Sequence, residues 1–535
     1  MSDPTPAPAS RRWYQSIGPG LITACVVIGP GSILTSSKVG AANGFAMSWV
    51  VVAAVVFMMT YMMIGARLGA VAGASPGTLV ADRAGRWLSV CIGIGVFFIS
   101  AAFQFGNNLG VHSAVKAYVD SEGGTFAIIL VVAFNALAIG FLFVFKDLYR
   151  TVERLMMCFV ALMLISFAAN LAFALAGMSE AREKLRTAKR SPFEAVTFED
   201  DTPHVTFEGD AFVLVSLNEI PVTEILEFTR NHKEFKAQWK DRFARDLVHV
   251  LTEMKHPPGE TVTLELRNVE SGKRRTVEKA PMTHENWKLV DREFNPLLDI
   301  SLLGLIGTTF VITAAFYQTY LVRQKGWGRR EVENSLVDAR VGAVLMALIT
   351  LMIMSTAGAV LRAQYLGNVD DVAAQLAPLF GVWGRPIFCV GLFSAAYSSF
   401  LVNSMIGGFI LADGLGFGSK PTNRAPKVLT TVVLLTGMGV ALFVITTGVK
   451  PVPAIIAAQA VTVIASPLMA GALLWLTNRK DVMGDDRNSA TVNAFAGLGF
   501  VLLVAMALYT AFVKLPETVE KWNKSRAVVK QSSQK

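Results

Sequence analysis

The chain is poor in charge and in cysteine, and both shortages exclude whole classes of protein. Charged residues make up 17% of its 535 residues and hydrophobic residues 53%, a balance typical of membrane proteins and not of water-soluble ones. The four cysteines stand singly in apolar segments, so their spacing predicts neither a metal site nor a disulfide framework. No nucleophile–base pattern and no phosphate-binding loop is present, and we therefore predict no enzyme, no cofactor and no nucleic-acid partner.

Long apolar segments dominate what is present. The mean hydropathy is +0.48, and a transmembrane helix needs about 20 mostly apolar residues. Eleven segments reach this length, which predicts an all-α membrane protein embedded in a lipid bilayer. These segments, called spans 1 to 11, are residues 17–44, 46–71, 87–113, 125–145, 151–177, 297–322, 336–361, 383–412, 427–448, 452–477 and 491–513.

Basic residues follow every second span, and this pattern predicts the orientation of the chain. Lys and Arg gather before span 1 and after spans 2, 4, 6, 8 and 10, and such residues favour the cytoplasmic side. We therefore predict a cytoplasmic N-terminus in a bacterial inner membrane, with a disordered polar tail over residues 1–16 and no cleavable signal peptide. The basic tail over residues 514–535 disagrees with this charge pattern, because eleven spans place the tail outside the cytoplasm.

Residues 178–296 break the apolar pattern between the membrane segments 17–177 and 297–513. They are charged and alternate in places with period 2, which predicts a small α+β domain on the extracytoplasmic side. The predicted elements are strands at 212–217, 261–266 and 274–278, a hairpin turn at 270–273, and an amphipathic helical stretch over 223–254.

The order of elements in this insert resembles the second half of PDZ modules that accompany proteases. Gly209-Asp210 precedes the first predicted strand, Pro258-Gly259-Glu260 precedes the second, and Gly272-Lys273 lies in the hairpin turn. The resemblance implies an extracytoplasmic peptide or protein partner bound by strand addition. The glycine-rich carboxylate-binding loop of those modules is not recognisable, so a domain that only caps the membrane part is the alternative.

Gly29-Pro30-Gly31-Ser32 lies in the middle of span 1. Gly and Pro relax the backbone and remove a hydrogen bond, and a broken backbone at membrane depth is tolerated only where it is buried in protein or lines a cavity. Discontinuous helices of this kind form the substrate sites of many secondary transporters. The tetrad therefore predicts a substrate site, and a simple kink is the alternative.

Short motifs recur in a fixed order along the spans. They are Gly18-Pro19-Gly20 and Gly40-Ala41-Ala42-Asn43 in span 1, residues 149–154 (YRTVER) before span 5, residues 307–313 (GTTFVIT) in span 6, residues 391–399 (GLFSAAYSS) in span 8, and Gln459 in span 10. This series resembles the Nramp family of divalent-metal transporters. The resemblance implies a LeuT-like fold, in which spans 1–5 and 6–10 are inverted repeats and spans 1 and 6 are broken at the site.

The departures from the family fall on its metal ligands. Where the family has Asp-Pro-Gly-Asn, this chain has Gly29-Pro30-Gly31-Ser32; where it has Ala, then Met three residues later, then Pro-His, the chain has Thr308, Val311, Ile312 and Thr313. The carboxylate, the thioether, the helix-breaking proline and the proton-relay histidine are all replaced. Neutral hydroxyl and carbonyl oxygens favour a hard ion that retains waters, as Mg²⁺ does, over softer metals. We also predict little proton coupling.

These observations predict a site and a polar pathway. The predicted substrate site is Gly29, Gly31, Ser32, Thr308, Thr309, Thr313 and Gln459, of which Gly29, Ser32 and Thr308 are the predicted metal-binding residues. The predicted pathway is Gln104, Asn108 and His112 on one face of span 3, with Tyr397 and Asn403 on span 8. Hydrogen bonding between helices is the alternative for the pathway residues.

The leading hypothesis is an Nramp-like secondary transporter that moves an inorganic, Mg²⁺-like cation by alternating access. One alternative is a transporter of a small organic solute on the same fold. The other is a non-transporting membrane sensor with an extracytoplasmic domain. Ion uptake into proteoliposomes separates the two transporters from the sensor.

Overall fold

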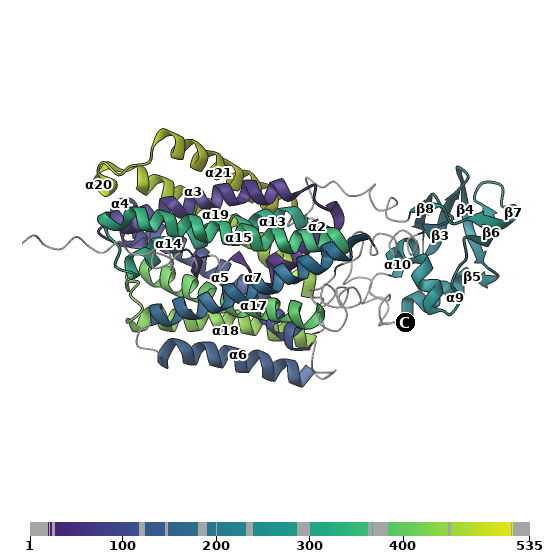
Figure 1. Cartoon of the computed structure of the whole chain (residues 1–535), viewed down its shortest axis with the longest axis horizontal. Coiled ribbons are helices and arrows are strands. Elements are labelled where there is room, and N and C mark those ends of the chain that lie inside the picture. Colours follow the sequence, from purple (N-terminus) through teal and green to yellow (C-terminus); the bar gives the residue numbers. More distant parts are fainter. Residues whose placement is uncertain are drawn as a thin grey trace, which may run out of the picture. The chain divides into compact units, whose positions relative to one another are not determined.

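The computed structural model divides the chain into two compact units, Met1–Leu175 with Ile300–Lys535, and Ala176–Asp299. We call them the membrane unit and the insert and describe each by itself (Figure 1). Side chains of α19 are described from Thr462 onward. The structure describes residues 20, 22–23, 27–116, 124–144, 148–179, 190–199, 201–231, 239–285, 300–361, 366, 384–447, 451–514 and 516.

Helices occupy all eleven predicted spans of the membrane unit, and nine described helices are long and apolar enough to cross a membrane. A short helix between spans 2 and 3, α4 (Pro76–Ala84), is an addition to the predicted elements. The other helices are α2 (Pro30–Asn43), α3 (Ser48–Val71), α5 (Arg86–Lys116), α6 (Gly124–Val144), α7 (Leu148–Ala176), α13 (Ile300–Thr309), α14 (Ile312–Gln324), α15 (Val332–Val360), α17 (Gly384–Gly414), α18 (Arg424–Thr447), α19 (Pro451–Asn478), α20 (Lys480–Met483) and α21 (Ala490–Tyr509), with single turns η3 (Arg329–Glu331) and η5 (Thr510–Lys514).

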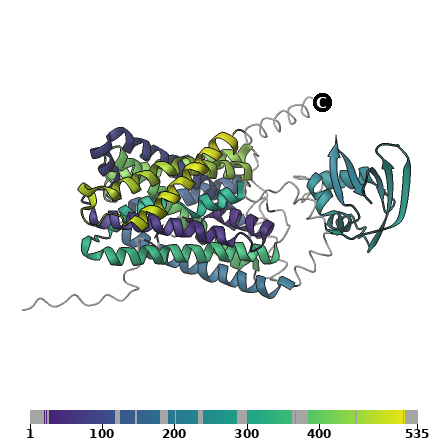
Figure 2. The ribbon, with the colours of Figure 1, turned by 90° about the horizontal axis from the view of Figure 1, so that it is seen from above.

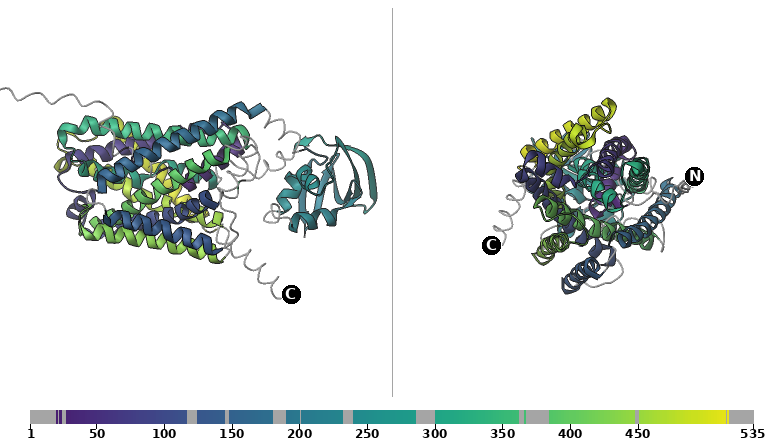
Figure 3. Two further views of the ribbon diagram at one scale, coloured as in Figure 1. Left: turned by 60° about the horizontal axis from the view of Figure 1, so that its bottom comes forward. Right: turned by 90° about the vertical axis from the view of Figure 1, so that its left-hand side faces the viewer.

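The helices of the membrane unit differ sharply in burial. Most residues of α17 and of the segment Leu302–Gln324, which holds α13 and α14, are buried, whereas only about a third of the residues of α6, α18 and α21 are buried. In the end-on view of Figure 3, α6 (blue) and α21 (yellow) lie at opposite edges of the bundle. Large apolar side chains such as Ile129, Phe443 and Val501 are exposed on these outer helices. Such a surface suits contact with lipid.

Polar contacts bring the loops after spans 2, 4, 6, 8 and 10 to one end of the membrane unit. Hydrogen bonds from Arg83 and Arg479 hold the pKa of Asp481, in the loop after span 10, below its usual range. These loops are the ones that the positive charge pattern assigns to a common side. The contacts are Arg83 Nε to Asp481 Oδ2 (2.7 Å), Arg329 Nη1 to Asp486 Oδ2 (3.7 Å), Lys325 Nζ to Glu153 Oε1 (2.9 Å) and Ser75 Oγ to Asp413 Oδ1 (2.7 Å).

The insert contains an antiparallel sheet that is visible in Figure 2. Its strands follow the order β2-β3-β4-β6-β7, with β5 paired to β4, while β1 and β8 form a separate pair. The three predicted strands correspond to β4, β6 and β7, and the β6–β7 hairpin is present. The strands are β1 (Arg190–Ser191), β2 (Ala195–Glu199), β3 (Thr202–Phe207), β4 (Asp210–Leu217), β5 (Ile220–Pro221), β6 (Thr261–Asn268), β7 (Arg274–Pro281) and β8 (His284–Glu285).

The helical stretch expected over 223–254 is interrupted. Three short helices take its place, α9 (Val222–Asn231), α10 (Trp239–Arg245) and α11 (Leu247–Glu253), and the break after α10 falls at Asp246, whose carboxylate pairs with Arg242. The buried faces of these helices and of the sheet form one hydrophobic core. Its fully buried side chains include Phe193, Leu217, Ile225, Phe243, Val250, Leu264 and Leu266.

Candidate functional site

Span 1 is broken at its Gly-Pro-Gly-Ser tetrad. Ile28 and Gly29 are not helical, and α2 begins at Pro30, which needs no partner for a backbone N–H at the first helical position. Gly29 is extended, with φ −136° and ψ 176°. Its N–H donates to Ser32 Oγ (2.9 Å), and Ser32 Oγ donates to the Gly29 carbonyl (2.8 Å). The Ser32 hydroxyl therefore fixes the broken backbone.

Span 6 is also broken, although it lacks the proline expected from the family. α13 ends at Thr309 and α14 begins at Ile312, so Phe310 and Val311 interrupt the helix. The Phe310 ring packs against Phe57 and Tyr61 of α3, with ring centres 5.8 and 5.6 Å away. We infer that this buried ring, instead of a proline, holds the chain out of the helix.

Threonine hydroxyls join the two broken helices. Thr35 Oγ1 on α2 lies 3.5 Å from Thr308 Oγ1 on α13, and Thr308 Oγ1 also donates to the Gly304 carbonyl (2.7 Å). Thr309 and Thr313 are buried, and Thr313 Oγ1 has no partner among the described residues. A helix end leaves its last carbonyls without intrahelical donors; at the end of α13 the Ile306 carbonyl accepts from Phe310 N–H (2.7 Å). The break thus gathers neutral oxygens from both repeats.

Two further helices reach the break at Gly29. A Cβ atom added to Gly29 would lie 3.1 Å from Asn107 Oδ1 on α5 and 3.1 Å from Ser399 Oγ on α17. Asn403 Nδ2 donates to Ser399 Oγ (2.8 Å), so the predicted pathway residue Asn403 is one hydrogen bond away from the break. Asn107 and Ser399 are therefore site residues that the predicted set does not contain.

The predicted pathway residues on α5 make a network between helices. Asn107 Nδ2 donates to Gln104 Oε1 (3.0 Å), and Asn108 Nδ2 donates to the Gln104 carbonyl (2.8 Å). Asn135 Nδ2 of α6 donates to Asn108 Oδ1 (2.7 Å). Gln104 reaches the break only through Asn107, and Asn108 points toward α6. His112 is one turn further along α5. The pathway through these residues stays a prediction.

Tyr397 and Gln459 do not add described contacts to the break. The Tyr397 ring stacks on Phe393 and Phe400 at 5.8 and 6.1 Å between ring centres and meets further rings from α6 and α7 edge-on. Its described role is therefore aromatic packing on α17. Gln459 lies on α19, and its side chain is outside the described part of the chain.

The side chains that bring oxygens to the break carry no charge. Among the described residues, no group of three or more His, Cys, Asp or Glu side chains could hold a metal ion. The additional site residues, Thr35, Asn107 and Ser399, carry hydroxyl and carboxamide oxygens as well. Thr35 had a sequence signal, because it lies three residues after Ser32 and shares its helix face. Asn107 also had a sequence signal, because it lies three residues after Gln104 and shares its helix face.

Comparison with known proteins agrees with this arrangement of two broken helices. A sequence model described as natural resistance-associated macrophage protein-like (Nramp) matches residues 20–188 and 279–513. The chain belongs to the Nramp family. Most of the insert lies between the two matched segments, so it is an addition to the part that defines the family.

Individual relatives of this Nramp protein are distant. The divalent metal cation transporter MntH of Verminephrobacter eiseniae is 26% identical over 226 residues, which cover 40% of this chain and 49% of the relative. MntH of Deinococcus radiodurans is 26% identical over 223 residues, 39% of this chain and 48% of the relative. The chain thus spans about half the length of the curated relatives it matches.

Solved structures confirm the predicted fold class. The crystal structure of the Eremococcus coleocola manganese transporter, in complex with an aromatic bis-isothiourea substituted compound, aligns with a TM-score of 0.61 and 15% sequence identity. The alignment covers 95% of this chain and 88% of that chain. The membrane unit therefore has the LeuT-like fold of Nramp proteins, and the sheet-containing insert accompanies it.

Proposed function

We propose that the protein is a secondary transporter that carries a hard divalent cation, with Mg²⁺ as its model substrate, through the break between spans 1 and 6. The observation that carries this proposal is the neutral oxygen set at the break: the hydroxyls of Thr35 and Thr308 and the carboxamide of Asn107. The curated relatives are named as divalent metal cation transporters, which supports cation transport as the coarser statement.

The chemistry of these oxygens favours a cation that keeps part of its water. Without a carboxylate at the break, full dehydration of a divalent ion would cost far more free energy than coordination by neutral oxygens would recover. Mg²⁺ dehydrates reluctantly and is usually bound with several waters. Transition metals gain most from thioether, thiolate or imidazole ligands, and Thr35, Thr308 and Asn107 carry none of these.

Alternating access requires that one end closes while the other opens, and buried polar contacts link the helices at the end that holds the basic loops. Tyr320 OH on α14 donates to Asp413 Oδ2 on α17 (2.7 Å). Gln318 Nε2 donates to Asp338 Oδ2 (3.3 Å), which also accepts from Gly20 N at the start of span 1 (2.6 Å). These buried carboxylates tie both broken helices to their neighbours, and we propose that they form the cytoplasmic gate.

Purified protein in liposomes is expected to take up Mg²⁺ more effectively than Mn²⁺ or Cd²⁺. The lumen of the liposomes is expected to acidify little, because Thr313 stands where the family has its proton-relay histidine. A Mg²⁺-sensitive dye and a pH dye inside the vesicles measure both quantities, and empty liposomes are the control. Micromolar binding of Cd²⁺ with saturable Cd²⁺ uptake would overturn the selectivity. Lumenal acidification that follows substrate entry would overturn the uncoupled mechanism.

One observation favours a small zwitterionic solute as the second candidate. The N-termini of α2 and α14 both begin at the break, at Pro30 and Ile312, and helix N-termini favour anionic groups such as a substrate carboxylate. Such a solute would place its cationic end on the α13 carbonyls. The same liposomes distinguish the candidates, because solute uptake without Mg²⁺ uptake supports the zwitterion. Failure to move any solute or ion would support a sensor.

The proposed orientation places the insert outside the cytoplasm. Ser271 lies exposed in the β6–β7 turn, where its N–H and hydroxyl bind Asn268 Oδ1. Ser271→Cys is expected to react with a membrane-impermeant maleimide on intact cells. The matched control is Asp485→Cys in the loop after span 10, which is expected to react only after lysis. The reverse pattern of labelling would overturn the proposed orientation.

A further inference from the structure

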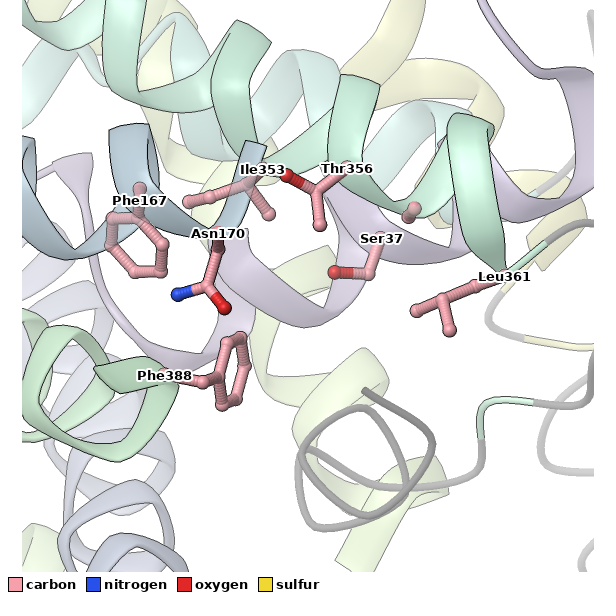
Figure 4. Close-up of a pocket in the computed structure, with 8 residues that line it drawn as sticks. Ser37, Phe167, Asn170, Ile353, Thr356, Leu361 and Phe388 are labelled. Carbon is pink, nitrogen blue, oxygen red and sulfur yellow. The ribbon is translucent and has the colours of Figure 1, made fainter. Parts of the chain in front are cut away.

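Two hollows in the membrane unit differ in what they can hold. The cavity in Figure 4, whose lining includes Ser37 and Asn170, has a volume of about 10 Å³ and suits one buried water molecule. A groove of about 440 Å³ lies between α19 and α21, at the end that holds the basic loops. We call it the α19–α21 groove, and its lining residues are Gly471, Leu474, Trp475, Asn478, Arg479 and Phe500.

Contacts between the two helices show that the groove is polar at one end and apolar at the other. Near the loop after span 10, Asn478 Nδ2 donates to Asn493 Oδ1 (2.9 Å), and Asn493 Nδ2 donates to Asn478 Oδ1 (2.7 Å). Further into the helices, a Cβ atom added to Gly471 would lie 3.2 Å from Cε2 of the Phe500 ring. Seven residues separate these two levels on each helix, which is roughly 10 Å along the axis.

The polar end of the groove carries positive charge. The Arg479 guanidinium lies over the Trp475 ring, with Cζ 5.1 Å from the ring centre. Arg479 Nε donates to Asp481 Oδ1 (2.8 Å) and Arg83 Nε donates to Asp481 Oδ2 (2.7 Å), so two guanidinium groups share one carboxylate. Among the described residues, no hydrogen bond uses Arg479 Nη1 or Nη2 or the Trp475 indole N–H. A positive charge and several N–H donors therefore remain for an anion.

The apolar end of the groove continues along the outer surface of the bundle. One face of α19 carries, at helical spacing, Ile464, Leu468, Gly471 and Trp475. Ile464 and Leu468 are each 39% exposed, and Leu498 on α21 is exposed as well. Figure 3 shows α21 at the edge of the bundle. Tryptophan is typical of the membrane–water interface, so an occupant of the groove has its polar end at the interface and its apolar part in the bilayer.

We propose that the α19–α21 groove binds one anionic phospholipid from the leaflet on the side of the basic loops. The lipid phosphate accepts hydrogen bonds from Arg479 and Trp475, and an acyl chain lies along Gly471 beside the Phe500 ring. Basic pockets between transmembrane helices are known to bind anionic head groups. A free anion would leave the apolar half of the groove empty. None of the lining residues belongs to the break, so the inference does not depend on the transported substrate.

The test measures lipid binding to the full-length protein in a non-ionic detergent by native mass spectrometry. One phosphatidylglycerol is expected to bind about tenfold more tightly than phosphatidylcholine, whose head group has no net charge. Arg479→Gln is expected to remove this preference, because the charge-assisted hydrogen bonds to the phosphate are lost. Lys480→Gln is the matched control, since it removes the same charge from an exposed neighbour that does not line the groove. It is expected to leave the affinity unchanged.

Equal effects of Arg479→Gln and Lys480→Gln would show a general attraction of charge and overturn the site. Binding of inorganic phosphate as tight as that of phosphatidylglycerol would make a free anion the occupant and overturn the lipid proposal. Gly471→Leu, which fills the apolar part of the groove, is expected to weaken phosphatidylglycerol binding while Arg479 stays in place. Thermal unfolding without added lipid checks that this variant is folded.

Tryptophan fluorescence locates the bound lipid independently of its affinity. Phosphatidylglycerol with brominated acyl chains is expected to quench the wild-type protein with a saturable component at low lipid concentration. Trp475→Phe should lack this component, because the ring nearest to the lipid no longer fluoresces at the tryptophan wavelength. Brominated phosphatidylcholine should not produce the component in either protein. Saturable quenching that Trp475→Phe leaves unchanged would place the lipid elsewhere and overturn the proposal.

Discussion

Gly29→Asp is expected to give the protein tight binding of Mn²⁺ and Cd²⁺, at least about tenfold tighter than the wild-type chain, since one well-placed charged ligand is worth more than 1.4 kcal/mol. The substitution restores the carboxylate that the family resemblance places at this position. An added Cβ would lie 3.1 Å from Asn107 Oδ1 and Ser399 Oγ, both polar ends of side chains that can turn aside. The carboxylate would therefore enter the break beside the oxygens of Thr35 and Thr308.

The same variant is expected to be destabilised when metal is removed. A buried carboxylate without a counter-charge costs several kcal/mol, and metal that binds only the folded state recovers stability in proportion to its concentration. Thermal unfolding in chelator and in millimolar Mn²⁺ measures both effects. Gly29→Asn is the matched control, because it has the same shape and no charge. Equal metal affinities of the two variants would contradict a cation site at the break.

A thioether added at the break should change which metal the protein prefers, and not only how tightly it binds metals. Val311 occupies the position of the family methionine, is buried, and forms the non-helical turn between α13 and α14. A soft sulfur ligand favours Cd²⁺ over Mg²⁺, so the double variant Gly29→Asp with Val311→Met should discriminate more strongly than Gly29→Asp alone.

Much of the fold follows from hydropathy and turn chemistry. Apolar length alone places the helices, and the Gly-Pro pair places the break in span 1, because both effects act locally on the backbone. The break in span 6 has no such local signal. Phe310 at this break packs against Phe57 and Tyr61 of α3, a contact between distant segments, and only the family resemblance predicts the break.

The candidate site was predicted less completely, for a similar reason. Thr308 and Ser32 lie where the motifs place them. Asn107 reaches the site because α5 presents this residue to span 1, and the sequence of α5 does not show which of its faces meets span 1. Gln104 and Asn108 share a face, yet that face meets α6 and α18, through Asn135 and through Gly437, whose added Cβ would lie 2.3 Å from Gln104 Cβ. A polar face on a helix therefore predicts hydrogen bonding and leaves its partner open.

Asp413→Ala is expected to be the most destabilising single change in the membrane unit. Asp413 is fully buried at the end of α17 and accepts three hydroxyl groups, from Ser75 (2.7 Å), Thr78 (3.1 Å) and Tyr320 (2.7 Å). Alanine removes the acceptor of the buried Tyr320 hydroxyl and of the half-buried Ser75 and Thr78 hydroxyls, which costs about 3–5 kcal/mol in total. The free energy of unfolding in mixed detergent micelles measures this loss.

The loss should also change the conformation, because the three donors belong to the α4 segment and to α14, while the acceptor belongs to α17. Without Asp413, the Tyr320 hydroxyl no longer holds the second half of span 6 against α17. The proposed cytoplasmic gate should therefore open more often. A cysteine at Thr78 should then react faster with a maleimide in Asp413→Ala than in wild type. Asp413→Asn keeps one acceptor oxygen and should fall between the two. Asp481→Asn, which removes an exposed carboxylate that pairs with Arg83 at the same end, should change neither quantity. If Asp413→Ala lowers stability but leaves the reaction at position 78 unchanged, these contacts hold the fold together and do not form a gate.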